Sequence, residues 1–426
     1  MKTENVDIAV IGAGAAGLSA SAVCAQAGLR TRVIDREEAP GGVLLQCIHN
    51  GFGLHYFHEE LTGPEYAARL VEKARAAGVE FQMEACVMKL RDLGNEKEVT
   101  VYSGADGVTI VRAKAVILAM GCRERSRGNL GIPGDRVAGV FTAGLAQRFL
   151  NIDGFVPGSS AVIVGSGDIG LIMARRLTWC GIQVKAVVEI LPYPSGLSRN
   201  IAQCLDDFHI PLRLSTTVTG IHGHDRVESI GIAPLVNGEP DLSREEIIPC
   251  DTVLFSVGLI PENELSRQCG IEINPSTNGA WVDGSLMTGV PGIFACGNVL
   301  HVHDLVDFVS EESENCAANA VEYVKNGSLP SEKQLRTTAA DNLSYVVPNA
   351  CRRGVPTRFS MRPKVLCRRA ELLVKGEGGT VLLRKKLQHV KPAEMITADL
   401  PGECTASCPE KTELRFGLHP EEKAEA

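Results

Sequence analysis

Two features of exported and membrane proteins are missing from this sequence. It has no run of about eighteen apolar residues that could cross a bilayer, and residues 1–5 lead into no apolar core of a signal peptide. Its fourteen cysteines are scattered, without the spacings of a secreted disulfide framework. We therefore expect a cytoplasmic protein with reduced thiols.

An overall excess of positive charge is also missing. The formal net charge is −8, which argues against nucleic acid as the main partner. The charge is uneven, because residues 351–391 hold twelve Lys and Arg against two Glu. This stretch predicts either a docking surface for an acidic partner or simply a solvated face. At 426 residues the chain is too long for a single core.

The strongest local pattern lies in residues 7–35. A short apolar strand is followed by a glycine-rich turn, a helix of small residues and a second strand that ends in an acid. Gly12 permits the tight turn, Gly14 lets a pyrophosphate approach the backbone, and Gly17 lets helix and strand pack closely. The helix N-terminus faces the phosphates, and the terminal acid can accept from a ribose hydroxyl. The pattern predicts a dinucleotide site formed by Gly12, Gly14, Ala15, Ala16, Gly17, Asp35, Arg36 and Gly42.

The same unit recurs in residues 161–189. Strand, glycine turn, helix and second strand follow in the same order, and the second strand ends in Glu189. Such a repeat predicts two dinucleotide sites in one chain. Ile190 and Leu191 follow the acid, with no adjacent Arg to neutralise a 2′-phosphate, which favours NAD(H) over NADP(H). The residues predicted for this site are Gly165, Gly167, Asp168, Ile169, Gly170, Glu189 and Gly258.

Two more strands end in glycine, residues 114–121 and residues 292–298. With the two repeats they occur in the order of the two-dinucleotide-binding-domain flavoproteins, which residues 5–330 resemble. That superfamily includes glutathione reductase, thioredoxin reductase and the NADH oxidases. The resemblance implies a bound FAD, also contacted by Ala119, Gly121, Gly297 and Asn298. The superfamily usually has Asp at the position of Asn298, and an amide oxygen can accept the same hydrogen bond.

The resemblance also implies an α/β fold with two Rossmann-like three-layer domains, the second inserted in the first. The FAD-binding domain then comprises residues 1–155 and 284–335, and the NAD(H)-binding domain residues 156–283. Alternating patterns beyond residue 340 predict a small β domain, so residues 336–426 form a basic C-terminal β domain and tail. We expect residues 5–330 to bind both cofactors unaided and residues 340–410 to serve as the docking module.

Residues 46–53, 121–125 and 298–304 resemble a narrower bacterial group, the flavoprotein subunits associated with glycerol-3-phosphate dehydrogenase. A sister group contains the alpha subunits of amine and opine dehydrogenases and of hydrogen cyanide synthase. Members of the sister group usually carry a cysteine-rich [2Fe–2S] domain, which the four C-terminal cysteines here do not fit. The resemblance implies an electron-transferring subunit of a hetero-oligomer. Its candidate partners are a small cysteine-rich protein and a dehydrogenase subunit.

The candidate catalytic residues are Cys47, His301 and His303. Disulfide reductases need two closely spaced cysteines beside the flavin, and no Cys-x2-Cys or Cys-x4-Cys lies before Pro330, so disulfide reduction is not expected. Cys47 could be a peroxidatic thiol or only a small residue packed near the ring. Either histidine could protonate or position a substrate, or be structural. We expect no metal site.

The leading interpretation is an FAD-dependent oxidoreductase that exchanges hydride between NAD(H) and a bound flavin within a multi-subunit dehydrogenase. Two enzymatic alternatives are a free-standing NADH oxidase or peroxidase that uses Cys47, and an alpha subunit of an amine or amino-acid dehydrogenase. A third, non-enzymatic alternative is a scaffold protein in which one nucleotide site is vestigial. The intact glycines and terminal acids of both repeats argue against this alternative.

Overall fold

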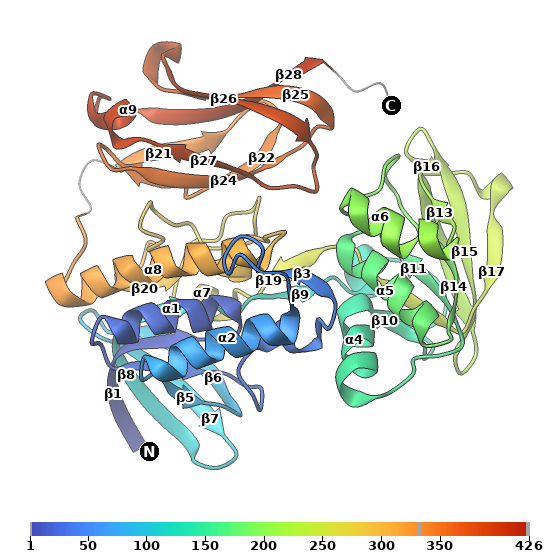
Figure 1. The fold of residues 1–426 in the computed structure, drawn as a ribbon, viewed down its shortest axis with the longest axis horizontal. Coiled ribbons are helices and arrows are strands. Elements are labelled where there is room, and N and C mark those ends of the chain that lie inside the picture. Colours follow the sequence, from blue (N-terminus) through green and yellow to red (C-terminus); the bar gives the residue numbers. More distant parts are fainter. Residues whose placement is uncertain (1, 331–333, 423–426) are drawn as a thin grey trace. The chain divides into compact units, whose positions relative to one another are not determined.

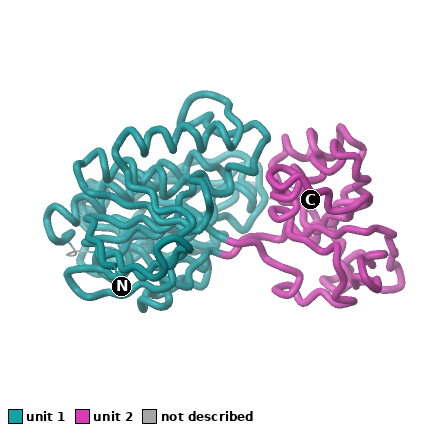
Figure 2. Tube along the Cα trace, turned by 90° about the horizontal axis from the view of Figure 1, so that it is seen from below, with its two compact units in different colours: residues 1–122, 261–426 teal, residues 123–260 magenta. Residues whose placement is uncertain are grey.

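The computed structural model describes residues 2–330 and 334–422. The chain forms two compact units (Figure 2): unit 1 comprises residues 1–122 and 261–426, and unit 2 comprises residues 123–260. The chain passes between the units in β9 (Cys122–Glu124) and β19 (Leu259–Pro261). Among the described residues, no helix is both long enough and apolar enough to span a membrane.

Unit 1 is organised around a seven-stranded sheet with the order β5-β2-β1-β8-β7-β6, in which β20 also pairs with β8. The central strand β1 (Lys2–Ile11) is parallel to β2 and β8, and its residues 8–11 are buried. A strand covered on both faces requires such an unbroken apolar run. The other strands are β2 (Thr31–Ile34), β5 (Glu80–Gln82), β6 (Ala85–Asp92), β7 (Lys97–Ser103), β8 (Gly107–Leu118) and β20 (Ile293–Ala295).

Three helices pack together along this sheet, with α1 (Ala15–Gln26) in contact with both α2 (Gly63–Ala76) and α8 (Val306–Asn326) (Figure 1). Helix α2 begins with a capping box, in which Thr62 and Glu65 satisfy each other's backbone amides. Helix α1 follows Gly14 directly and has no side-chain cap. The first amides of α1 are therefore available to an external anion.

The C-terminal part of unit 1 is a β domain made of two sheets, with the orders β23-β21-β28-β25-β26 and β22-β24-β27. Phe359, Leu372 and Phe416, which come from both sheets, share one buried core. The predicted small β domain is therefore confirmed. Its strands are β21 (Gln334–Ala339), β22 (Leu343–Val347), β23 (Ala350–Arg352), β24 (Thr357–Pro363), β25 (Cys367–Lys375), β26 (Val381–Val390), β27 (Ile396–Leu400) and β28 (Glu413–Glu422).

Unit 2 contains a parallel sheet with the order β10-β18-β11-β12-β13 and a smaller antiparallel sheet of β14, β15, β16 and β17. The parallel strands are β10 (Val140–Thr142), β11 (Ser160–Val164), β12 (Gln183–Val188), β13 (Leu212–Arg213) and β18 (Thr252–Phe255). The antiparallel strands are β14 (Thr216–Gly223), β15 (Val227–Val236), β16 (Glu239–Pro240) and β17 (Glu246–Pro249). The helices of this unit include α4 (Ala143–Arg148), α5 (Asp168–Trp179) and α6 (Ser198–Cys204).

The limits of unit 2 differ from the expected residues 156–283 at both ends. Residues 123–155 belong to it, because β10 pairs with β18 inside its parallel sheet. Residues 261–283 belong to unit 1, where Ile271, Ala280 and Val282 are buried in its main core. Sequence motifs locate the glycine turns well, but they do not show with which core a connecting segment packs.

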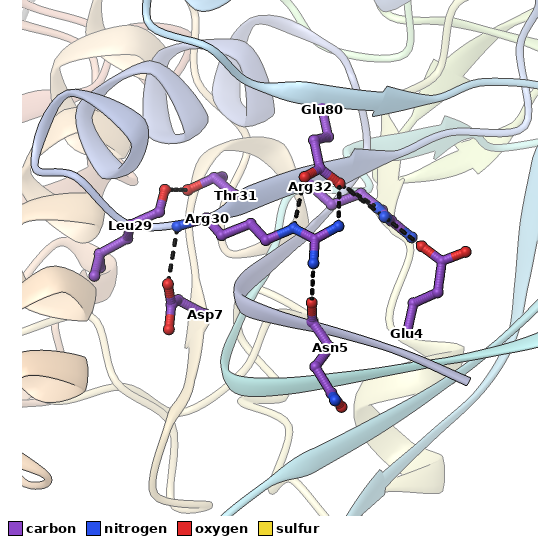
Figure 3. Close-up of polar contacts among 8 residues, drawn as sticks. All are labelled: Glu4, Asn5, Asp7, Leu29, Arg30, Thr31, Arg32 and Glu80. Carbon is purple, nitrogen blue, oxygen red and sulfur yellow. Dashed lines mark hydrogen bonds and ion pairs between the residues drawn. The ribbon is translucent and has the colours of Figure 1, made fainter.

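Ion pairs join the starts of three strands in unit 1 (Figure 3). Nη2 of Arg32 lies 2.6 Å from a carboxylate oxygen of Glu4 and 2.7 Å from one of Glu80. Arg30 Nε lies 2.6 Å from the other oxygen of Glu80, and its Nη1 donates to the carbonyl of Asn5. Because β1, β2 and β5 are parallel, their starts share one edge of the sheet and the glycine turn after β1 lies at the opposite edge. The network therefore stabilises the sheet away from the candidate site.

We predict that Glu80→Gln lowers the free energy of unfolding by about 1 kcal/mol at pH 7, because Arg30 and the mostly buried Arg32 lose a shared carboxylate. The hydrogen bond from Arg30, opposed by burial, lowers the pKa of Glu80 below its ordinary 4.5. The stabilisation is therefore complete above pH 4.5 and is lost as the pH falls through the lower pKa of the folded state. Urea unfolding at neutral and acid pH measures the difference.

The control for this variant is Glu413→Gln, which removes the exposed pair with Arg415 and should change the stability little. Equal stabilities of wild type and Glu80→Gln at pH 7 would contradict the assignment.

Candidate functional site

The first glycine turn lies at the carboxyl end of β1 and has the geometry of a phosphate-binding turn. Gly12 has a φ of +109°, and a Cβ there would collide with the carbonyl oxygen of Ala119. A Cβ at Gly17 would collide with the carbonyl oxygen of Gly12. At Gly14, by contrast, no atom lies within 4 Å of where a Cβ would stand. The turn is thus closely packed on its inner side and open at the glycine that a pyrophosphate approaches, so these residues fit a dinucleotide.

Asp35 stands directly after β2 and braces this turn. One of its carboxylate oxygens accepts from the amide of Ala13 at 2.5 Å, and the other accepts from the amide of Glu37 at 2.9 Å. Of the remaining predicted residues, Ala15 and Ala16 lie buried in the first turn of α1 and Gly42 packs against Gly14. The side chain of Arg36 is 76% exposed. The structure therefore gathers the predicted residues of the first site, with Arg36 at its margin.

Two further glycine-ended strands reach the same place in unit 1. Ala119 follows β8, and its amide donates to the carbonyl of Ile11 at the end of β1. Gly297 follows β20, and a Cβ there would lie 2.8 Å from the Cβ of Ala16. Gly121 has a φ of +71° and open space beside it. Predicted residues from three separate segments are thus brought together at one edge of the sheet.

The amide at position 298 uses both of its polar atoms. Its Oδ1 accepts from the backbone amide of His303 at 3.0 Å, and its Nδ2 donates to Sγ of Cys122 at 3.7 Å. An Asp could accept the first hydrogen bond but could not donate the second. The departure of Asn298 from the usual Asp therefore agrees with its surroundings.

His301 and His303 meet Glu312 of α8 in a buried cluster. Nε2 of His301 lies 2.8 Å from Oε2 of Glu312, and Nε2 of His303 lies 3.4 Å from the same oxygen. The other oxygen of Glu312 accepts from the amide of Gly297 at 2.8 Å. Although burial opposes it, the two histidines hold the pKa of Glu312 well below its usual range, and burial lowers the pKa of His301. A buried carboxylate thus fixes the loop that carries Gly297.

These three side chains are also a group that could hold a metal ion, since their ligand atoms lie within 4.8 Å of one another. The same side chains also form hydrogen bonds with one another and with the backbone. Nδ1 of His303 lies 3.0 Å from the carbonyl of His301, so this nitrogen donates a proton. Its Nε2 faces the carboxylate of Glu312 at 3.4 Å, so both ring nitrogens of His303 have partners within the protein.

In unit 2 the second glycine turn repeats the first. Gly165 has a φ of +97°, and a Cβ there would collide with the carbonyl oxygen of Ser256. The amide of Gly170 donates to the hydroxyl of Ser256 at 3.0 Å. A Cβ at Gly167 would meet no atom closer than the hydroxyl oxygen of Ser256 at 3.7 Å. As in unit 1, the middle glycine faces space that a pyrophosphate can enter.

Glu189 and Asp168 are both engaged within unit 2. The buried carboxylate of Glu189 accepts from the hydroxyls of Ser166 and Ser195, at 2.5 Å and 2.9 Å. Asp168 accepts from the amide of Leu197 at 2.8 Å. Both acids thus bind the segment that follows β12 to the glycine turn. Ile169 is half-buried beside Asp168 at the start of α5, and Gly258 has a φ of +100° between β18 and β19.

Cys47 is buried in unit 1, and its thiol donates to the carbonyl of Val43 at 3.3 Å. Burial raises the pKa of this thiol to about 12. All fourteen cysteines lie in the described part of the chain and are thiols, so Cys47 forms no disulfide. A peroxidatic cysteine reacts as the thiolate, so the geometry favours the packing role that the sequence left open.

Sequence reasoning missed several residues that hold these sites. Glu312 lies fourteen positions after Asn298, and the sequence has no pattern that links the two. Ser166, Ser195 and Ser256 are equally inconspicuous, because each forms a hydrogen bond to a residue more than twenty positions away in sequence.

We predict that Cys47 resists alkylation by iodoacetamide at pH 8 while the exposed Cys86 reacts, because a buried thiol with a pKa of about 12 supplies almost no thiolate. Mass spectrometry of the labelled peptides measures both sites in one sample, and unfolding in urea should make them equally reactive. Labelling of Cys47 in the folded protein as fast as that of Cys86 would restore the peroxidatic interpretation.

The sequence of this chain matches a known protein family and several known proteins. The family model described as "Pyridine nucleotide-disulphide oxidoreductase" matches residues 6–323. The chain is 27% identical to one of the subunits of the opine oxidase of Agrobacterium tumefaciens, over 63% of its own length and 55% of that protein. It is 29% identical to the thioredoxin reductase of Treponema pallidum, over 70% and 90% of the two chains. With the HcnB protein of the hydrogen cyanide synthase of Pseudomonas protegens the identity is 27%, over 63% and 60%. The chain thus spans little more than half of its opine oxidase relative.

Solved structures show the same fold. The thioredoxin reductase of T. acidophilum covers 75% of this chain and is itself 98% covered, with a TM-score of 0.62 and 22% identity. The Lactococcus lactis thioredoxin reductase gives a TM-score of 0.61 over 75% and 99% of the two chains, also at 22% identity. The predicted α/β fold of two Rossmann-like domains is therefore confirmed. The chain belongs to the pyridine nucleotide-disulphide oxidoreductase family.

Proposed function

We propose that unit 1 binds FAD, that unit 2 binds NAD(H), and that the chain is the electron-transferring subunit of a multi-subunit dehydrogenase. The observation that carries the proposal is the pair of matching glycine turns, each closely packed on one side and open at its middle glycine, in two separate compact units. When bound, the two cofactors supply hydride transfer between nicotinamide and flavin. The chain supplies binding and position.

In unit 1 the proposed roles follow from the contacts. Gly14 and the uncapped start of α1 bind the pyrophosphate, and Asp35 binds a ribose while it braces the turn. Gly297 and Asn298, fixed by Glu312 and His303, bind the flavin side of the cofactor. His303 and His301 then act by holding this loop, which is the structural role left open by the sequence.

In unit 2 the acid at the end of β12 supports NAD(H) over NADP(H). The carboxylate of Glu189 is anchored by Ser166, Ser195 and the amide of Leu191. A fixed carboxylate at this position repels a 2′-phosphate and can accept from a 2′-hydroxyl.

The sequence lacks the closely spaced cysteine pair that disulfide chemistry beside a flavin uses. Reduction of a disulfide needs a thiol pair, and no Cys-x2-Cys or Cys-x4-Cys lies before Pro330. The electrons are therefore proposed to pass to or from a partner protein. The relatives named as subunits belong to opine oxidase and hydrogen cyanide synthase, so they support a multi-subunit assembly. The glycerol-3-phosphate dehydrogenase partner and a cytoplasmic location remain predictions.

The basic stretch of residues 351–391 is a candidate contact surface for that partner. Fewer of its positive charges are unpaired than its composition indicates. At least four of its basic residues form ion pairs inside unit 1: Arg358 with Glu311 and Asp399, Arg362 with Asp304, Arg384 with Glu371, and Lys391 with Glu394.

Two matched variants test the assignment of one cofactor to each unit. Gly14 and Gly167 both have extended backbone and room for a methyl group, so alanine should fold normally at either position. We predict that Gly14→Ala loses FAD while its apoprotein keeps the wild-type melting temperature. Gly167→Ala should keep FAD and raise the KM for NADH about tenfold or more. Each variant controls for the other, and loss of FAD in both would refute the division of the sites.

We further predict that NADH reduces the bound flavin at least about tenfold faster than NADPH, because Glu189 disfavours a 2′-phosphate. Glu189→Gln keeps the size of the side chain and should narrow this ratio. Stopped-flow absorbance measures both rates. Equal rates with the two nucleotides in the wild type would contradict the role of Glu189.

A further inference from the structure

Residues 297–304, here called the site loop, lie between β20 and α8. On one side the loop is held by α8, through the hydrogen bonds of Glu312 to Gly297 and His301. Within the loop, the amide of His303 donates to Asn298. These contacts hold the loop from Gly297 to His303, and they leave out its far end at Asp304.

The far end is held by the C-terminal β domain, through Arg362 of β24. Nη1 of Arg362 lies 2.7 Å from a carboxylate oxygen of Asp304, and its Nη2 donates to the carbonyl of Val302 at 3.0 Å. The other carboxylate oxygen of Asp304 accepts from the amide of Met395 at 2.6 Å. Nη1 of Arg362 also donates to the carbonyl of Ala393. One guanidinium thus joins the site loop to the connection between β26 and β27.

These contacts are shielded from water. The side chains of Arg362 and Asp304 are 16% and 21% exposed. His301 is buried, and the ring of Tyr345 from β22 stands 5.9 Å from its own. A charged hydrogen bond that is shielded from solvent contributes more than an exposed pair. The β domain therefore covers and fixes the site loop.

We propose that Arg362 is a positioning residue of the FAD site, so that the C-terminal β domain is a part of that site. This inference rests on the proposed function, in which Gly297 and Asn298 bind FAD. Through Asp304 and Val302, Arg362 fixes the segment whose His303 amide orients Asn298. It replaces our sequence-based expectation that residues 5–330 bind both cofactors unaided.

The geometry explains why the position holds arginine. Three acceptors on two different segments surround the group: Asp304, Val302 and Ala393. A planar guanidinium presents donors to all three at once, whereas a lysine ammonium is a single point of contact on a flexible stem. Lysine at position 362 should keep the pair with Asp304 and lose part of the remaining contacts.

The same strand offers a matched control in Arg358. It also joins the β domain to α8, through Glu311 at 2.9 Å, and it pairs with Asp399 at 2.8 Å. Its side chain is 55% exposed, and both of these partners lie outside the site loop. Removing the charge of Arg358 therefore tests whether loss of an ion pair between β24 and α8 is by itself enough to weaken FAD binding.

The experiment compares full-length wild type, Arg362→Gln, Arg362→Lys and Arg358→Gln. Each protein is freed of flavin, and FAD is titrated back to measure Kd by fluorescence. The visible circular dichroism of the bound flavin reports its surroundings, and the melting temperature of the apoprotein reports folding. We expect Arg362→Gln to raise the Kd about tenfold or more and to change the flavin spectrum. Arg362→Lys should recover part of the affinity, and Arg358→Gln should match wild type in Kd and spectrum.

If Arg362→Gln does not fold, Asp304→Asn provides the same test, because it removes the charge from the loop and leaves Arg362 its two carbonyl acceptors. It should weaken FAD binding in the same direction. Wild-type Kd and spectrum in the folded Arg362→Gln or Asp304→Asn protein would overturn the inference, as would an equal loss in Arg358→Gln. A wild-type protein that binds no FAD would overturn the proposed function itself.

Discussion

Close backbone approach at the carboxyl edge of the unit 1 sheet is the constraint on which the rest of this structure depends. Gly12 and Gly17 admit no side chain, because a Cβ at either position would collide with a neighbouring carbonyl oxygen. The same closeness places Gly297 against Ala16, so that three segments far apart in sequence meet beside one helix start. Unit 2 applies the same rule with Gly165 and Ser256. Binding sites for extended, phosphate-bearing ligands follow from this packing.

Charged side chains and their hydrogen bonds then hold the glycine turns and the site loop in place. Asp35 braces the first turn, Glu189 braces the second, and Glu312 holds the site loop from α8. Arg362 completes the arrangement from the C-terminal β domain. Each of these four ionisable side chains is shielded at least in part from solvent. An unpaired charge in such a place costs much free energy, so the hydrogen bonds and ion pairs of these side chains are important for stability. These four side chains therefore hold the backbone of the two glycine turns and of the site loop.

The parts of this picture that the sequence predicted are those encoded locally. The spacing of Gly12, Gly14 and Gly17, repeated from Gly165, identifies both turns. A Cβ at Gly12, Gly17 or Gly165 would collide with a backbone carbonyl oxygen, so the sequence needs glycine there. Glu312 and Arg362 could not be predicted, because their partners lie far away in sequence and one Glu or Arg carries no pattern. For the same reason the unit boundaries differed from expectation, and composition overstated the free charge of residues 351–391.

The central claim is that this chain passes hydride between NAD(H) and one flavin without a redox-active dithiol. An anaerobic titration of the purified protein with NADH, followed by flavin absorbance, tests it most directly. The account predicts one FAD per chain, fully bleached by one equivalent of NADH. Uptake of a second equivalent before bleaching is complete would reveal a redox-active disulfide, and a flavin that stays oxidised would show that NADH is not its donor; either result would contradict the account.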